Sequence, residues 1–330
     1  MRNITYDNAK GIGLILVILG HLLPFGNLQS SVIYSMHMPL FFYISGIFIT
    51  NKGYKRLIFN YISPYVFFQF IIGGIILMFK SFKSHDGFNE LLVRFFKEIF
   101  IYSGSRFTYM DHLWFLVALV ISMVFAKIIL QSIEKIGRRQ ICYTVIIVFL
   151  SMIAIFMNKN SIILPFRLQS VPAIIMLLII GNRYNGIISK IIETFSKFWF
   201  CILVVSFIVL SIVNRTVNMS LAVYNNYLLY LFTAFLGISI VIYISKRIHL
   251  KFLSYMGKNT LILFAIHGVW IQVYKMLLNN ISISLHDMCG LYCYVGTVVV
   301  LVCSLGSYWI LKKIYFNYDS LMRNVLNVEK

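Results

Sequence analysis

Four histidines and one arginine stand inside, or at the edge of, long apolar runs of this 330-residue chain. They are His21, His37, His112, Arg167 and His267. An ionisable side chain at the centre of a bilayer costs about 2.5–3.5 kcal/mol on insertion scales, so such residues usually face a bundle interior or a wet cavity. Imidazoles in a cavity are suited to proton transfer and to nucleophilic catalysis. The pattern therefore predicts a chemical site within a membrane.

His21 is the strongest candidate for chemistry. It lies eleven residues beyond Lys10, so on a helix it would stand about 16 Å from the end that carries Lys10. For His37 and His267, a role as a hydrogen-bond partner between helices is an equal alternative. His112 precedes Trp114 at an expected interface, where amphipathic side chains are at home.

Arg167 differs from the histidines because a guanidinium group cannot lose its charge. It must find a carboxylate, a carbonyl oxygen or an anionic ligand. With the four histidines it occupies one expected depth band, and we expect the five groups to come together from different helices.

A second charged group gathers near the start of the chain. Asp7 and Lys10 open the first apolar run, and Lys55 and Arg56 follow the second one, with Arg2 close in sequence. For Arg2 and Lys55 the favoured interpretation is a role in setting topology. Asp7 is different because acidic residues contribute little to topology, so we expect it to pair with Lys10 or Arg56. A basic mouth of this kind suits an anionic ligand.

The composition places these residues in a membrane protein. The chain is 60% hydrophobic and 12% charged, with a mean hydropathy of +0.86, whereas soluble domains are about 25% charged. The net charge of +19 raises the alternative of a nucleic-acid partner. We do not expect one, because the basic residues sit in short clusters between apolar runs.

We expect an all-α helical bundle with about ten transmembrane helices. The spans are expected near residues 8–24, 31–50, 57–79, 111–132, 140–157, 161–181, 199–213, 226–245, 259–278 and 290–312. Residues 1–315 would form one membrane domain and residues 316–330 a short cytoplasmic tail. The connection at about 80–110 has helical apolar spacing. It is either a connector lying in the membrane interface or a lid over an outward-facing cavity.

The orientation follows from the loops. Nineteen of the 29 Lys and Arg fall in alternate connections counted from the N-terminus and seven in the opposite ones. The larger set is Arg2, Lys10, Lys52, Lys55, Arg56, Lys135, Arg138, Arg139, Arg183, Lys190, Lys197, Lys246, Arg247, Lys251, Lys258, Lys312, Lys313, Arg323 and Lys330. Cytoplasmic loops carry the excess of positive charge, so both termini are expected in the cytoplasm.

The cysteines indicate little chemistry. Cys142, Cys201 and Cys303 lie within apolar runs and are expected to pack as small hydrophobic residues. Cys289 and Cys293 lie one helical turn apart near the outer end of the last span. A disulfide between them is an open alternative. No metal is expected, because neither a C-x-x-C pair nor a His/Cys quartet occurs.

Several motifs occur in an order that resembles one known family. The chain opens with Asp7-Asn8-Ala9-Lys10-Gly11, an apolar run to Gly20-His21, and Met38-Pro39-Leu40-Phe41-Phe42 with Ser45-Gly46. His112-Leu113-Trp114-Phe115-Leu116, the run from Pro165 and Arg167 to Gly181, and Gly257-Lys258-Asn259-Thr260-Leu261 before His267 follow. Together they resemble the acyltransferase 3 family of integral membrane acyltransferases, particularly its polysaccharide O-acetyltransferase branch.

This resemblance implies an enzyme that moves an acyl group, commonly acetyl, from cytoplasmic acyl-CoA to a hydroxyl group of an extracytoplasmic or lipid-linked acceptor. The family's essential histidine falls on His21 and its basic residue after the D-x-x motif on Lys10, where many members have Arg. The family's arginine-rich motif is only partly present, as Lys55-Arg56 followed by Asn60. The chain shows no appended esterase domain of the SGNH type.

The expected function is therefore an O-acetyltransferase of the cytoplasmic membrane, with acetyl-CoA as donor substrate and a glycan as acceptor. His21 would act as a general base or would itself carry the acyl group. Arg167, His112, His267 and His37 would stabilise the oxyanion or hold the acceptor, and Trp114 would stack on a sugar ring.

Other functions and the assembly stay open. A transporter or flippase of a lipid-linked oligosaccharide or an anionic metabolite is the alternative, because buried His and Arg also suit a translocation pathway. A non-catalytic assembly or sensor protein is a third hypothesis. Membrane lipid is an expected partner, and an oligomer is compatible with the sequence.

Overall fold

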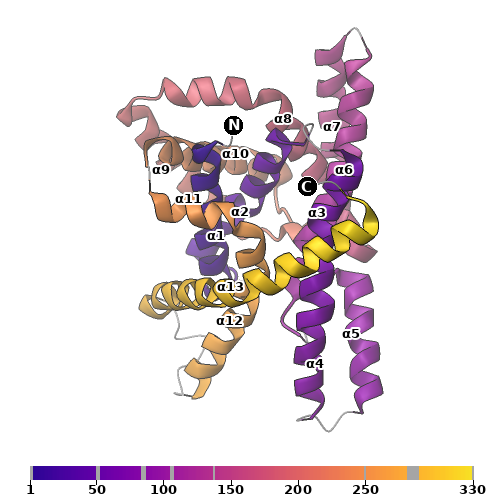
Figure 1. The fold of residues 1–330 in the computed structure, drawn as a ribbon. Helices are drawn as coiled ribbons and strands as arrows, with labels where there is room; N and C mark the ends of the chain where they lie inside the picture. The colour runs from indigo at the N-terminus through magenta and orange to yellow at the C-terminus, as the bar shows by residue number, and fades with distance from the viewer. Residues whose placement is uncertain are drawn as a thin grey trace.

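The long apolar runs fold into helices. The computed structural model describes residues 3–49, 53–82, 87–104, 108–136, 138–248, 250–280 and 290–328. Within these residues all regular structure is helical apart from one isolated bridge between Asn218 and Val223. The α-helices are α1 (Ile4–Leu22), α2 (Leu28–Ile47), α3 (Tyr54–Val66), α4 (Gly73–Ser81), α5 (Phe88–Tyr102), α6 (Trp114–Glu134), α7 (Arg139–Lys159), α8 (Val171–Glu193), α9 (Lys197–Asn214), α10 (Tyr227–Arg247), α11 (Lys251–Lys258), α12 (Thr260–Asn280) and α13 (Leu291–Leu326) (Figure 1).

Shorter helical turns join or interrupt these helices. The π-helical turn η1 (Phe67–Ile72) joins α3 and α4 into one helix. The turns η2 (Asp111–Leu113), η3 (Pro165–Ser170) and η4 (Met219–Leu221) are 3₁₀ in type. The first two lead directly into α6 and α8, and η4 lies between α9 and α10.

Eight helices of the described chain are long and apolar enough to cross a membrane. They are Tyr54–Ser81, Asp111–Glu134, Arg139–Lys159, Pro165–Glu193, Lys197–Asn214, Tyr227–Arg247, Thr260–Asn280 and Leu291–Leu326. The 19-residue α1 and the 20-residue α2 are also long, but Asp7, Lys10, His21 and His37 lower their apolar character. The expected all-α polytopic membrane bundle is confirmed, with segments close to those expected from hydropathy.

Helix α1 lies in the interior, in contact with α2, α10, α11, α12 and α13. Its contact with α11 is close because glycine stands on each side of it. A Cβ atom at Gly257 would lie 1.7 Å from the carbonyl oxygen of Asp7, and one at Gly11 would lie 2.4 Å from that of Leu253. The Asn8 amide donates to the carbonyls of Ser245 and Ile248 at the end of α10, at 3.4 and 2.6 Å. The opening motif therefore ties α1 to two neighbours.

Helices α2 and α8 cross closely through a second pair of glycines. A Cβ at Gly46 would lie 2.2 Å from the carbonyl oxygen of Leu178, and one at Gly181 would lie 2.1 Å from that of Tyr43. Only hydrogen fits at either position, so this crossing explains why the sequence carries glycine there. It sets the direction of the helix that carries His37.

The connection at 80–110 contains the expected amphipathic helix, α5, with Leu91, Phe95 and Ile99 buried. It does not lie across the end of the span. It runs back beside α4 (Figure 1). The ring of Phe95 in α5 lies 6.4 Å from the ring of Phe70 in η1, the turn that precedes α4. The buried side of α5 thus packs on the preceding helix and on η3, where the ring of Phe100 lies 6.3 Å from that of Phe166.

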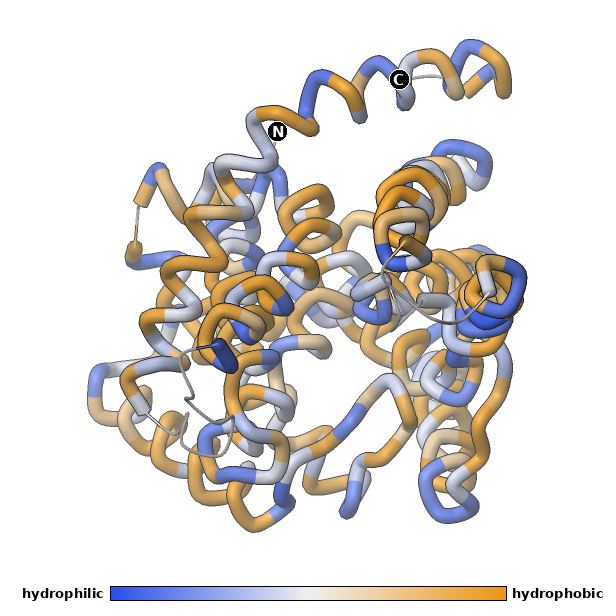
Figure 2. The backbone as a smooth tube through the Cα atoms, turned by 90° about the horizontal axis from the view of Figure 1, so that it is seen from below, coloured by the Kyte–Doolittle hydropathy of each residue, from blue (hydrophilic) through white to orange (hydrophobic). Residues whose placement is uncertain are grey.

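Helix α13 is longer than its expected span. It reaches Leu326, so residues that we expected to form a tail continue the helix. In this part Arg323 bonds Asp319 at 2.7 Å and the Asn60 side chain of α3 at 2.8 Å. Blue and orange alternate along the end of the helix in Figure 2, whereas long orange stretches dominate the other spans.

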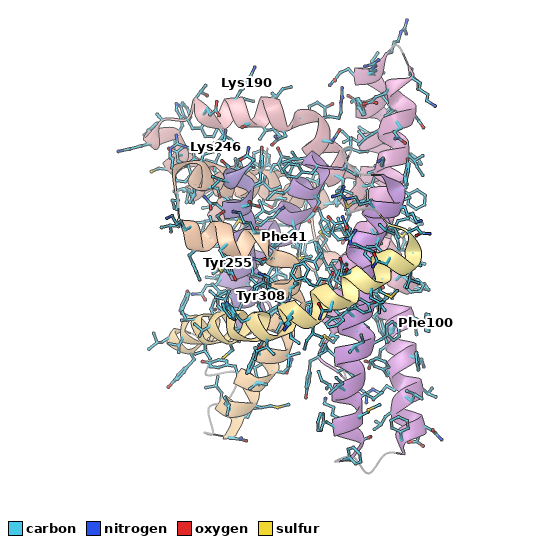
Figure 3. The ribbon with its side chains drawn as sticks, viewed as in Figure 1. Phe41, Phe100, Lys190, Lys246, Tyr255 and Tyr308 are labelled. Carbon is cyan, nitrogen blue, oxygen red and sulfur yellow. The ribbon has the colours of Figure 1, made fainter. Side chains whose placement is uncertain are left out.

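Basic residues from different connections gather at one end of the bundle. Figure 3 labels Lys190 of α8 and Lys246 of α10 close together there. Lys246 Nζ bonds Glu193 at 2.6 Å and the Ser189 carbonyl at 3.3 Å. The two connections belong to the same side in the topology expected from the charge count.

Candidate active site

A cavity of about 400 Å³ lies between α1, α2, α12 and the turns η2 and η4. Its walls are Val17, His21, Tyr34, His37, Met38, Tyr109, Asp111, His112, Trp114, Asn218, Met219, Ser220, Phe264, His267, Gly268, Ile271, Gln272 and Lys275. The cavity brings together the four histidines and Trp114 from helices far apart in sequence. Ligand sites for small molecules commonly fall at about 300–1,000 Å³, so a sugar-sized group fits.

His21 stands in the last turn of α1, where it is exposed to the cavity. Its imidazole makes no hydrogen bond within the described part of the chain. Its ring centroid lies 5.6 Å from that of His267. Both ring nitrogens are therefore available to a bound substrate.

His267 and His112 form a second, buried pair, with ring centroids 4.6 Å apart. His267 Nδ1 donates to the Phe264 carbonyl of its own helix, and His112 Nε2 donates to the Ala265 carbonyl at 3.0 Å. A carbonyl oxygen only accepts, so the protonated nitrogen of each ring is assigned by its partner. The remaining nitrogen of His267, Nε2, is buried without a partner among the described residues.

The close seat of His112 requires a glycine. A Cβ at Gly268 would lie 2.3 Å from His112 Cε1 and 2.4 Å from Nδ1. Helix α12 thus supplies His267, accepts a hydrogen bond from His112 and leaves space for that ring. The sequence pair His267-Gly268 is the local signal of this arrangement.

Aromatic side chains make up another part of the wall. His37 Nδ1 donates to the Ile33 carbonyl at 2.8 Å, and its ring meets Tyr34 edge to face at 4.9 Å. Trp114 and Tyr109 add two further aromatic side chains. Such rings stack on the apolar faces of sugars and leave polar edges for hydrogen bonding.

Arg167 does not line the cavity but lies directly behind it. It is 1% exposed, and its guanidinium bonds Asp111 at 3.4 Å and the Tyr102 carbonyl at 3.3 Å. Arg167 and Phe166 both have a positive φ, 59° and 56°, which aims the side chain inward from η3. The expected carboxylate and carbonyl partners of Arg167 are thus found. The residue positions Asp111, which does line the cavity, rather than contacting the cavity itself.

A family model described as an acyltransferase domain matches residues 3–309, which is most of the chain. The chain belongs to the acyltransferase 3 family. No curated protein and no solved structure matches it. The family and the apolar helices together make this chain a multi-pass membrane acyltransferase.

The four residues expected to bind the donor do not line the cavity of the acyltransferase. Asp7 is buried against α11, and Lys10 Nζ lies 5.8 Å from the centre of the Phe48 ring. Lys55 and Arg56 are exposed at the start of α3, and Lys55 Nζ donates to the Asn327 carbonyl at 2.9 Å. Of the four, Asp7 and Lys10 occupy the opposite end of α1 from His21.

Several residues of the site were not anticipated from the sequence. Asp111 and Lys275 are the charged ones, and Tyr34, Tyr109 and Gln272 are polar or aromatic. The only sequence signal for Asp111 was the need of Arg167 for a carboxylate. Arg323, which bonds Asn60 where the arginine-rich motif is incomplete, lies about 260 residues away along the chain.

The expected absence of a metal and the possible disulfide both stay predictions. Within the described residues, no group of three or more His, Cys, Asp or Glu is placed to hold a metal ion. Cys289 lies outside the described residues, so the disulfide with Cys293 stays an open alternative. Cys293 itself is buried beside the Leu22 carbonyl.

Proposed function

We propose that the acyltransferase moves an acetyl group from cytoplasmic acetyl-CoA to a hydroxyl group of a cell-surface polysaccharide or of its lipid-linked precursor. The proposal places the chain in the cytoplasmic (inner) membrane with both termini inside. The cavity then opens on the outer side, because it contains η4 from the connection between α9 and α10. Membership in the acyltransferase 3 family supports this activity over the alternative of a transporter.

One observation carries the proposal. Of the four imidazoles in the cavity, three bond backbone carbonyls through one ring nitrogen, and the exposed His21 does not. In a direct transfer, a nitrogen of His21 takes the proton of the acceptor hydroxyl as its oxygen attacks the thioester carbonyl carbon. The carbon–sulfur bond then breaks and CoA leaves as the thiol. General-base catalysis of this kind contributes about 10²–10⁴ in rate.

A covalent route uses the same residue. His21 itself would attack the thioester, release CoA and hand the acetyl group to the acceptor in a second step, which gives ping-pong kinetics. The nearby His267 suits either route as a holder of the acceptor, because its Nε2 can accept from a hydroxyl group, and His112 fixes the wall beside it. Trp114 and His37 would contact the sugar ring from the cavity wall.

The donor would enter from the opposite end of α1. Lys10, Lys55 and Arg56 supply positive charge there for the phosphates of CoA, with Asp7 as the carboxylate that orients Lys10. Lysine lacks the bidentate fork of arginine, so we expect Lys10 to act as a point charge. The acetyl thioester must then reach about 16 Å along α1, the rise of the eleven residues between Lys10 and His21.

The test is transfer of radiolabelled acetyl from acetyl-CoA in membranes that contain this chain, with surface polysaccharide of the same cell as acceptor. Wild type should produce base-labile label in the polysaccharide. His21→Ala should lower it by at least 10²-fold at equal protein level. Lys159→Ala, which removes an exposed side chain at the end of α7 that does not line the cavity, is the control and should keep wild-type transfer.

The alternatives have distinct outcomes. Label that survives in His21→Ala would keep the enzyme and reject His21 as its base or nucleophile. No label with any acceptor from that cell would reject acetyl transfer and return weight to a transporter.

A further inference from the structure

The cavity wall carries a cation that acyl transfer alone does not require. Lys275 lies two turns beyond His267 on α12 and lines the cavity. Its Nζ donates to the His21 carbonyl at 2.9 Å. An ammonium group has three donors, so one bond to a carbonyl leaves two for other partners.

This bond has a structural consequence of its own. The last carbonyls of α1 lack partners within the helix and carry partial negative charge. Lys275 therefore caps α1 and fixes the backbone of His21. A cap explains the bond, but it does not explain why the ammonium group belongs to the wall of a cavity.

The charge balance of the wall supplies the second argument. Among its described residues the other permanently charged side chain is Asp111, and Asp111 pairs with Arg167. No carboxylate of the described chain pairs with Lys275. Within the described part of the chain, the cavity therefore keeps one positive charge beside His21. Charge within a concave site with low-dielectric walls concentrates ligands of opposite sign.

We propose that Lys275 selects an acceptor that carries an anionic group, a carboxylate or a phosphate, near the hydroxyl that receives the acyl group. The inference rests on the proposed function for its acceptor, but the charge preference belongs to the cavity itself. The anion bonds the ammonium group, which brings the neighbouring hydroxyl to the imidazole of His21. A neutral sugar can contact the same aromatic wall of the cavity, but it offers no anionic group to Lys275.

Binding without an acyl donor tests this preference. Calorimetric titration of the purified protein in lipid nanodiscs at low salt uses three probes of similar size: methyl glucoside, glucuronate and glucose 1-phosphate. For wild type we expect at least one anionic probe to bind about tenfold more tightly than methyl glucoside. The two anions distinguish a carboxylate from a phosphate.

Three variants separate charge from capping. Lys275→Met keeps much of the side-chain length and should abolish the tenfold preference, whereas Lys275→Arg keeps the charge and should retain it. Lys159→Met removes an exposed lysine from the end of α7, away from the cavity, and should bind as wild type. A cap alone would lower thermal stability in Lys275→Met without changing the ratio of affinities.

Three outcomes would overturn the inference: equal affinity for neutral and anionic probes, a preference that persists in Lys275→Met, and no binding of any probe at millimolar concentration. Failure of the acetyl-transfer assay with a retained charge preference would reject the proposed function alone. Active transfer with equal affinities would reject the charge selection alone.

Discussion

At the scale of single residues, the three imidazoles from His21 through His267 to His112 differ in how they are held. Two are fixed by carbonyls of α12, and the ring of His112 lies so close to Gly268 that no Cβ atom would fit there. His21 is held only through its own backbone, by Lys275. Substitutions behind the fixed rings should therefore disturb the geometry of the site without removing any polar group from it.

Gly268→Ala tests this packing. The added methyl would overlap His112 Cε1 and Nδ1, at 2.3 and 2.4 Å, so the ring must move. We expect acetyl transfer to fall at least tenfold, with a loss of stability of about 1–3 kcal/mol, as for overpacked cores. Gly186→Ala in α8, where an added Cβ meets nothing within 4 Å, is the control and should transfer as wild type. Unchanged transfer in Gly268→Ala would show that acetyl transfer does not depend on the position of the His112 ring.

The ion pair of Arg167 and Asp111 gives a second prediction. The pair joins η3 to η2, and His112 follows Asp111 directly. Arg167→Met and Asp111→Asn should each lower the thermal midpoint and the transfer rate. The double variant should cost less than the sum, with a coupling of roughly 0.5–3 kcal/mol, as residues in contact show. Additive losses would indicate that the two side chains act independently.

At the scale of elements, α1 connects the two ends of the site. It bears His21 in its last turn, and near its first turn it packs on α11 through the backbone of Gly257. The short α11 depends on this contact for its position, because three of its eight residues are lysine or glycine and its apolar face is small. The opening motif therefore has a packing role that any donor-binding role must share.

Gly257→Ala should separate these elements. Its Cβ would lie 1.7 Å from the Asp7 carbonyl oxygen, which neither backbone can accommodate without a shift. We expect a lower thermal midpoint of unfolding in detergent. We also expect a higher KM for acetyl-CoA, because transfer at low acetyl-CoA concentration should be slower. Gly306→Ala in α13, where nothing lies within 4 Å, should match or exceed wild-type stability, since alanine favours helix over glycine by about 1 kcal/mol. Equal midpoints for the two variants would contradict the packing role.

At the scale of the whole molecule, the bundle has two chemically different ends. Lys190 and Lys246 mark one end, and the cavity with η2 and η4 marks the other. The excess of lysine and arginine in alternate connections predicts that the first end faces the cytoplasm. An acyl group taken up there and delivered in the cavity would travel about 16 Å along α1, which is about half of the hydrocarbon core.

Cysteine accessibility in a background without native cysteines tests the orientation. Lys159→Cys and Lys190→Cys stand at exposed positions in connections expected on opposite sides. A thiol reagent that cannot cross membranes should label Lys159→Cys in intact cells and Lys190→Cys only after permeabilisation. The reverse pattern would invert the topology and place the cavity in the cytoplasm.

Hydropathy and charge by themselves determined the helical membrane fold and most segment boundaries, because burying twenty apolar residues in lipid requires a helix whatever its neighbours are. Local sequence also singled out His21, His37, His112, His267 and Arg167, since each is costly in lipid. It missed the continuation of α13 beyond residue 315 and the placement of α5 beside α4, because both depend on contacts with other helices, such as the bond of Arg323 to Asn60.

Only the tertiary structure decided which of these residues share a cavity. Asp111 and Lys275 also stand at the edge of or inside expected spans, but their roles depend on Arg167 and on the end of α1, 56 and 254 residues away. The structure also put Arg167 behind the wall and left His21 as the exposed, unbonded imidazole. Contacts between residues so far apart along the chain follow from helix packing, which the spacing of polar groups within one helix does not specify.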